Sequence, residues 1–205
     1  MIKQSSRARF LMPFTLPSSF LNLMSPTPVL PSSIDDEEPP SSLCDISVEL
    51  IVDDSVSASL DEDAIRSTVL SAVQTAAVHR GFSSGTVGVR ITDDAAIRQL
   101  NAKHLGHDYA TDVISFSYEA DPPHLEGELV VSVDTARQKA SEIGWPAESE
   151  LLLYIVHGVL HITGMDDHEP TDRREMRQAE ESVFLKLGIR EISRCGADIQ
   201  PEDSQ

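Results

Sequence analysis

Residues 147–162 are the segment that most constrains how this chain of 205 residues can fold. Apolar side chains lie on nearly every side of a helix built from this segment, at Leu151, Leu152, Leu153, Ile155, Val156, Val159, Leu160 and Ile162. A helix with almost no polar face must be covered by other elements. The chain is 40% apolar, which is enough for one packed core around such a central helix.

The rest of the globular region alternates between β-rich stretches and amphipathic helices. Strands are predicted over residues 46–52, 86–92, 112–117 and 128–133. Further helices are predicted over residues 61–79, from a cap at Thr92 or Asp93 to Asn101, from a cap at Asp134 to Ile143, and over 171–187. This order predicts the α/β class, as an α+β sandwich in which helices pack on a mixed sheet of about four strands.

Both ends of the chain differ from the region between them. Residues 1–44 are rich in serine and contain seven prolines, so we expect a disordered extension without a membrane-spanning run. Residues 1–24 are basic and lack acids, which leaves open a targeting peptide or a translation start at Met12 or Met24. Residues 45–190 are predicted to form a single domain, and residues 191–205 a flexible acidic tail.

The formal charge of −18 lies mostly in the globular region, because residues 45–195 carry −14 of it. Such a charge excludes a uniformly basic nucleic-acid binder and favours a solubilising or salt-adapted surface over recognition of a basic partner. The two cysteines, Cys44 and Cys195, lie far apart and show no CxxC spacing. A disulfide framework is therefore not expected, and the pattern fits a cytoplasmic protein.

The central helix also carries two histidines, His157 and His161, at positions i and i+4. This spacing places both imidazoles on one helix face, where they can bind one metal ion. Gly164 then allows a turn that returns either Asp167 or His168 as a third ligand. Two buried imidazoles without partners would be costly, so we favour a Zn²⁺ site with an open position for water over simple core packing.

Three blocks of sequence resemble the YbeY family of zinc-dependent endoribonucleases. Residues 157–168 are similar to the family signature HGxLHLxGxD(H), residues 111–116 to its TDVLSF strand, and residues 126–132 to its LGDIVIS strand. The blocks follow in the family's order, and the likeness covers about residues 46–187. The resemblance implies a metal cleft formed with the buried central helix, one Zn²⁺ per chain, and cleavage of single-stranded RNA. It also implies a role in ribosomal RNA maturation and ribosome quality control, with ribosomal RNA and ribosomal subunits or assembly factors as partners.

The chain departs from the family pattern at three positions. The family's third ligand is usually a histidine ten residues after the first, where this chain has Asp167 followed by His168. We favour His168, because a turn can absorb one residue and imidazole is the commoner ligand. Leu105 stands where many members have an arginine, so Lys103, His104 or His107 would either substitute for that arginine or be ordinary exposed residues. Glu128 replaces an aspartate and keeps the carboxylate.

Other residues receive roles around the predicted site. Zinc would activate either a water molecule or the ribose 2′-hydroxyl for phosphodiester cleavage. Glu128 would either orient an imidazole or face solvent. Thr111 and Ser115 would either bind the substrate phosphate or form hydrogen bonds with backbone groups at the strand ends. Cations near the cleft would contact RNA or form a solvated surface: Arg90, Arg98, Lys103, Arg137, Lys139, Arg173, Arg174 and Arg177.

Two other functions share some of these features. Zinc proteases also hold zinc with HxxxH on a helix, but their general-base glutamate follows the first histidine, where this chain has Gly158. A ribosome-assembly factor that is stabilised by metal but does not cut RNA would fit the acidic surface and Leu105. The sequence does not indicate an oligomeric state.

Overall fold

The computed structural model describes residues 3–5, 44–190 and 192, and its central feature is one mixed sheet. The strand order is β1-β4-β5-β3-β2, in which β4 and β5 are antiparallel and the other neighbours are parallel. The strands are β1 (Lys3–Ser5), β2 (Asp45–Val52), β3 (Ser84–Thr92), β4 (Val113–Asp121) and β5 (His124–Ser132). The predicted α/β class with a mixed sheet is confirmed.

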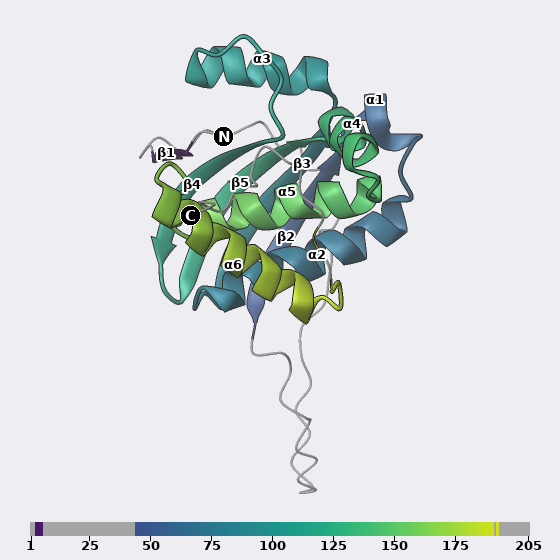
Figure 1. The fold of residues 1–205 in the computed structure, drawn as a ribbon. Coiled ribbons are helices and arrows are strands. Elements are labelled where there is room, and N and C mark those ends of the chain that lie inside the picture. The colour runs from purple at the N-terminus through teal and green to yellow at the C-terminus, as the bar shows by residue number, and fades with distance from the viewer. Residues whose placement is uncertain (1–2, 6–43, 191, 193–205) are drawn as a thin grey trace, which may run out of the picture.

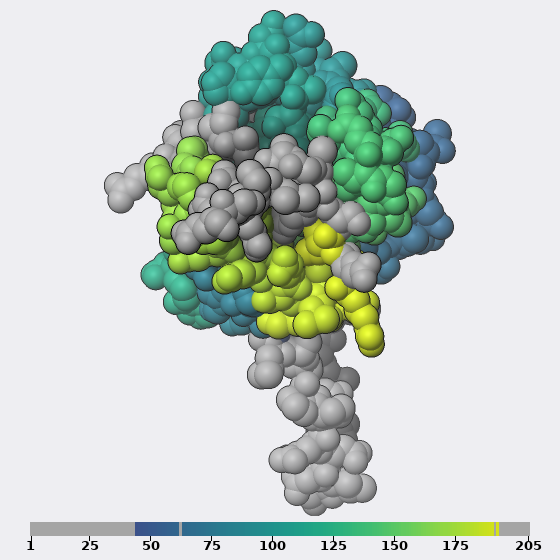
Figure 2. All heavy atoms as spheres, viewed as in Figure 1, coloured from purple at the N-terminus to yellow at the C-terminus, as the bar shows by residue number. Residues whose placement is uncertain are grey.

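Six helices complete the described part of the chain. They are α1 (Asp54–Ser57), α2 (Glu62–His79), α3 (Asp94–Leu105), α4 (Val133–Ile143), α5 (Ala147–Ile162) and α6 (Pro170–Lys186). Figure 1 shows α2, α5 and α6 side by side over one face of the sheet. Helix α3 is set apart from them, at the top of the view in Figure 1 and Figure 2. None of the helices in the described ranges has the length and apolarity needed to cross a membrane.

The main core lies between α5 and the sheet. Alternation along β3 and β5 turns Val87, Val89, Ile91, Leu129 and Val131 into this layer, where all are buried. Twelve of the sixteen residues of α5 are buried, as its almost wholly apolar sequence predicts. A second, smaller cluster of Ile97, Ile114 and Val130 joins α3 to the opposite face of the sheet.

Several predicted boundaries differ from the observed ones. Ser132, and not Asp134, caps α4, because its hydroxyl accepts from the backbone N–H of Thr135 at 3.2 Å. Helix α3 continues past Asn101 to Leu105 and ends at Gly106, which takes the left-handed conformation with φ 75°. The hairpin strands β4 and β5 extend further toward Pro122 than their apolar cores indicate.

The sheet also has a fifth strand that the sequence did not indicate. Strand β1 pairs in parallel with the edge strand β4, with Lys3 opposite Ser115. Three residues are too few for an alternating pattern, so only the free edge of β4 explains their conformation. Apart from β1 and Cys44, the predicted extension over 1–44 lies outside the described residues, as do Cys195 and, apart from residue 192, the predicted tail over 191–205.

Candidate metal centre

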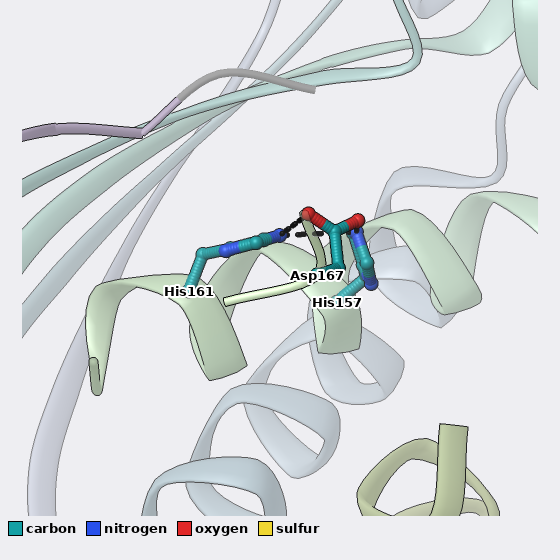
Figure 3. A group of neighbouring side chains, drawn as sticks. All are labelled: His157, His161 and Asp167. Atoms are coloured by element: carbon teal, nitrogen blue, oxygen red, sulfur yellow. Dashed lines mark hydrogen bonds and ion pairs between the residues drawn. The ribbon is translucent and has the colours of Figure 1, made fainter. Parts of the chain in front are cut away.

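Helix α5 places His157 and His161 one turn apart on the same face. Their rings lie edge to face with centroids 4.6 Å apart, and the two Nε2 atoms are separated by 3.2 Å. Figure 3 shows both imidazoles directed toward the same point above the helix. The predicted convergence of the two histidines is present in the structure.

Two glycines allow α5 to lie close enough to the sheet to hold this position. A Cβ on Gly158 would lie 2.6 Å from Cδ2 of Leu129 and 3.0 Å from Cγ2 of Val113. One turn further along the helix, a Cβ on Gly127 of β5 would lie 2.7 Å from Cγ2 of Ile162. No side chain larger than that of glycine fits at either position. Glycine at positions 127 and 158 therefore determines how closely α5 and its histidines approach the sheet.

A turn after α5 brings Asp167 back over the histidines. Gly164 takes φ +100°, and the backbone N–H of Met165 donates to the carbonyl of Leu160 at 3.0 Å, which reverses the chain. An Asp167 oxygen then lies 3.6 Å from Nε2 of His157, and its other oxygen lies 3.7 Å from Nε2 of His161. The carboxylate therefore faces both imidazoles (Figure 3).

The Nδ1 atoms of the two histidines have partners of their own. Nδ1 of His157 forms a hydrogen bond with Oε1 of Glu180, a residue of α6 that is 2% exposed. Nδ1 of His161 lies 2.9 Å from the carbonyl oxygen of Met165, which can only accept. When a neutral imidazole carries its proton on Nδ1, its Nε2 is unprotonated and has a lone pair that can bind a metal ion. Two such lone pairs and a carboxylate converge here, and this arrangement requires a cation or a proton between them.

The charges of these groups depend strongly on one another. Burial alone would lower the pKa of His157, but Asp167 and Glu180 outweigh it and raise that pKa to about 9. Burial and the positive charge of His157 lower the pKa of His161 to about 4. The interaction with His157 lowers the pKa of Asp167 to about 2. Without a metal, His157 therefore holds the one additional proton, which lies between its own Nε2 and the facing acceptors of His161 and Asp167.

The donor set of His157, His161 and Asp167 fits a zinc ion. Two imidazoles and a carboxylate are common ligands of catalytic Zn²⁺, and ligands at tetrahedral positions lie about 3.3–3.6 Å from one another. The three separations of 3.2, 3.6 and 3.7 Å, the last two to different oxygens of Asp167, lie within about 0.1 Å of this range. His161 is 2% exposed, whereas His157 and Asp167 remain 16% and 25% exposed, so the site opens on one side.

The structure brings Asp167 to the histidine pair, whereas the sequence favoured His168. The side chain of His168 is 65% exposed, and its Nδ1 bonds instead to Oδ1 of Asp166. Arg173 of α6 explains this path, because its Nη1 donates to the carbonyl of His168 at 2.8 Å. A second group of possible ligands, formed by Asp166, Asp167 and His168, lies mostly at the surface.

Glu128 is not near either imidazole. Successive side chains of a strand point to opposite faces, and Leu129 faces α5, so Glu128 faces away. Its Oε2 accepts from the hydroxyl of Tyr118 at 2.8 Å. The structure thus places Glu180 in the position that the sequence interpretation gave to Glu128. One sequence signal marks Glu180, because it falls within the stripe of α6 that buries Met176 and Val183.

The residues predicted to bind substrate lie under or beside α5. Ser115 is 2% exposed beneath Gly158, and its Oγ has no hydrogen-bond partner among the described residues. Thr111 is half-buried and donates to Oδ1 of Asp112 at 2.8 Å. Val113, the residue after Asp112, packs on α5 at Gly158, so this loop ends beside the turn of α5 that carries both histidines. Ser115 is too buried here to contact a phosphate.

Most cations proposed for RNA contact have other partners. Four of them pair with carboxylates: Arg90 with Asp53, Arg98 with Asp108, Arg137 with Asp134 and Lys139 with Glu142. Leu105 packs against the small apolar cluster between α3 and the sheet. A cation is therefore missing at that position, in agreement with the sequence interpretation.

Comparison with known proteins links this site to one family. The family model described as endoribonuclease YbeY matches residues 50–188. A protein named endoribonuclease YbeY from Rhodopirellula baltica is 47% identical over 142 residues, which are 68% of this chain and 73% of that protein. One of the same name from Desulforamulus reducens is 36% identical over 62% of this chain and 90% of its own length.

Proposed function

The chain belongs to the endoribonuclease YbeY family, and we propose from this premise that it is a zinc-dependent endoribonuclease acting on single-stranded RNA. Ribosomal RNA maturation and ribosome quality control in the cytoplasm are the proposed processes, with ribosomal RNA and subunits as partners. One observation carries the proposal: two imidazole Nε2 atoms and the Asp167 carboxylate converge in a partly open site.

The chain's own residues would prepare the site for this chemistry. Zinc, when bound, would supply an activated oxygen nucleophile and a Lewis acid for the phosphodiester. Glu180 and the carbonyl of Met165 hold the Nδ1 protons, which leaves both Nε2 atoms as ligands. Burial of His161 and Glu180 excludes water behind the ligands, so the reacting phosphate would approach from the side of Asp167.

Alanine variants of the two histidines test the proposal. The zinc-loaded full chain should cut single-stranded ribosomal RNA, and His157→Ala and His161→Ala should each lose this activity. A matched control is His124→Ala, which alters a half-buried histidine at the first position of β5, outside the group of facing ligands. Intact RNA after incubation with zinc-loaded wild-type protein would contradict the proposal, as would equal cleavage by wild type and the two active-site variants.

A non-cleaving assembly factor remains the second candidate, because Leu105 contributes packing where a cation would contact phosphate. This alternative predicts that His161→Ala still associates with ribosomal subunits and that wild type does not cut their RNA. The zinc-protease alternative has less support. A glutamate cannot replace Gly158, since even a Cβ there would lie 2.6 Å from Leu129, and the general base of that reaction is therefore missing.

A further inference from the structure

An exposed aromatic pair lies on the loop between α3 and β4. Tyr109 is 55% exposed, and it is the one aromatic residue among the large exposed apolar residues of the described ranges. Its ring stacks on the imidazole of His107 with centroids 5.5 Å apart and an interplanar angle of 19°. One face of Tyr109 is thus supported while most of the ring remains open to solvent.

Buried contacts hold this pair in place. Asn101 is 1% exposed, and its side-chain Nδ2 donates to the carbonyl of Tyr109 at 2.9 Å. The backbone N–H of His107 donates to the carbonyl of Asn101 at 3.3 Å, just after the left-handed turn at Gly106. The backbone that carries both rings is therefore anchored to α3, so the ring would lose little conformational freedom on binding a ligand.

The same loop leads directly into the metal centre. It ends at Val113, whose side chain packs on α5 at Gly158, the residue next to His157. Four residues of extended chain span at most about 14 Å, so Tyr109 lies within that distance of Val113 along the backbone. An RNA strand at the metal centre can extend to the Tyr109 ring within a few nucleotides.

The negative charge of the domain favours RNA contacts that do not depend on positive side chains, such as stacking of a base on an aromatic ring. Residues 45–195 carry −14, and four of the cations considered for RNA contact are paired with carboxylates. Binding through phosphate neutralisation is weakened as a result. Stacking of a base on an aromatic ring needs no positive charge, and it accepts any base because every base has a π-face.

We propose that Tyr109, supported by His107, is a stacking subsite for one unpaired base of the RNA substrate. The inference rests on the proposed endoribonuclease function and adds a reason for preferring single strands. A base within a duplex is stacked and paired, so only an unpaired base can reach the ring. Tyr109 is a binding residue in this account and takes no part in the chemical step.

Binding and cleavage of a single-stranded RNA oligonucleotide test the subsite. Binding is measured by fluorescence anisotropy in the presence of a chelator, so that the RNA stays intact. We expect Tyr109→Ala to raise Kd about tenfold and Tyr109→Phe to bind like wild type. Leu185→Ala, which removes a 66% exposed side chain on α6, is the matched control and should have no effect. With zinc, Tyr109→Ala should raise KM and leave kcat unchanged.

Abasic substitutions locate the base that stacks. Scanned along the oligonucleotide, one abasic position should weaken binding to wild type about tenfold and have no effect on Tyr109→Ala. Equal Kd and KM for wild type and Tyr109→Ala would overturn the subsite and leave the nuclease proposal intact. Binding that depends on Tyr109 without cleavage by zinc-loaded protein would support the subsite and overturn the nuclease proposal. Absence of RNA binding by wild type would overturn the subsite.

Discussion

His157 and Glu180 form a buried hydrogen-bonded pair between Nδ1 of the imidazole and Oε1 of the carboxylate, and this pair joins α5 to α6. The Glu180 side chain is 3% exposed, and the imidazole of His157 helps to compensate the burial of its charge. The pair fixes the ring so that Nε2 faces His161 and Asp167. Helix α6 thus contributes to the metal centre although it supplies none of the three facing ligand atoms.

Substitution of Glu180 by glutamine should weaken zinc binding without removing a ligand. The amide keeps the shape of the carboxylate but withdraws the negative charge that makes His157 a better ligand. Loss of such a supporting contact costs about 10–100-fold in metal affinity. Competition against a chromophoric chelator measures the change, with Glu181→Gln as the exposed neighbouring control. Equal affinities for wild type and Glu180→Gln would show that the pair only stabilises the fold.

Asp167 and His168 should differ sharply as zinc ligands. Asp167→Ala removes the carboxylate that faces both imidazoles, so it should reduce zinc affinity by more than the roughly 10–100-fold of a supporting contact. His168→Ala removes an exposed ring that bonds to Asp166 and should change the affinity little. The same chelator competition compares the two variants. A larger loss for His168→Ala would return the third ligand to the residue that the sequence favoured.

Zinc should raise the melting temperature of the chain. A ligand that binds only the native state at 100 times its Kd stabilises it by about 2.7 kcal/mol, which corresponds to roughly 5–10 °C for a domain of this size. Chelator-treated protein, measured by calorimetry, should lose this increment. His161→Ala should melt at one temperature with or without zinc, and an equal zinc-induced shift in that variant would indicate binding elsewhere.

Gly158→Ala should destabilise the domain even though alanine is the better helix former. The added Cβ would lie 2.6 Å from Leu129, which is 1% exposed and cannot move into solvent. Overpacking of this kind costs about 1–3 kcal/mol, more than the helix propensity gain of about 1 kcal/mol. Urea unfolding measures the loss. Because Leu129→Ala removes the clashing atoms, Gly158→Ala should cost less in that background, and a stabilised single variant would contradict the packing.

Local patterns in the sequence were sufficient for the elements with strong periodicity. The segment 147–162 was predicted with its observed bounds, because an apolar helix between Pro146 and Gly164 has few alternatives. The i, i+4 spacing likewise predicted that His157 and His161 converge, since helix geometry alone determines it. Family membership and the α/β class are confirmed by the comparisons and the fold.

Contacts between distant residues were harder to predict. Asp167 reaches the histidines, and His168 does not, because Gly164 sets the turn and Arg173 binds the loop carbonyls from α6. Glu180 lies 23 residues from His157, so no local pattern links them. Its place within the buried stripe of α6 is a signal that the sequence offers for burial, and it does not identify His157 as the partner. The roles of residues 6–43 and of the tail stay predictions.

The dependence of RNA cleavage on zinc tests the central claim most directly. Chelator-stripped full-length protein is titrated with Zn²⁺, and the initial rate of cleavage of a single-stranded RNA is measured at each addition. The account predicts no cleavage without metal and a rate that rises linearly to a plateau at one zinc per chain. It also predicts that His161→Ala stays inactive throughout. Full cleavage by the stripped protein, or cleavage by His161→Ala at the wild-type rate, would contradict a metal centre built from His157, His161 and Asp167.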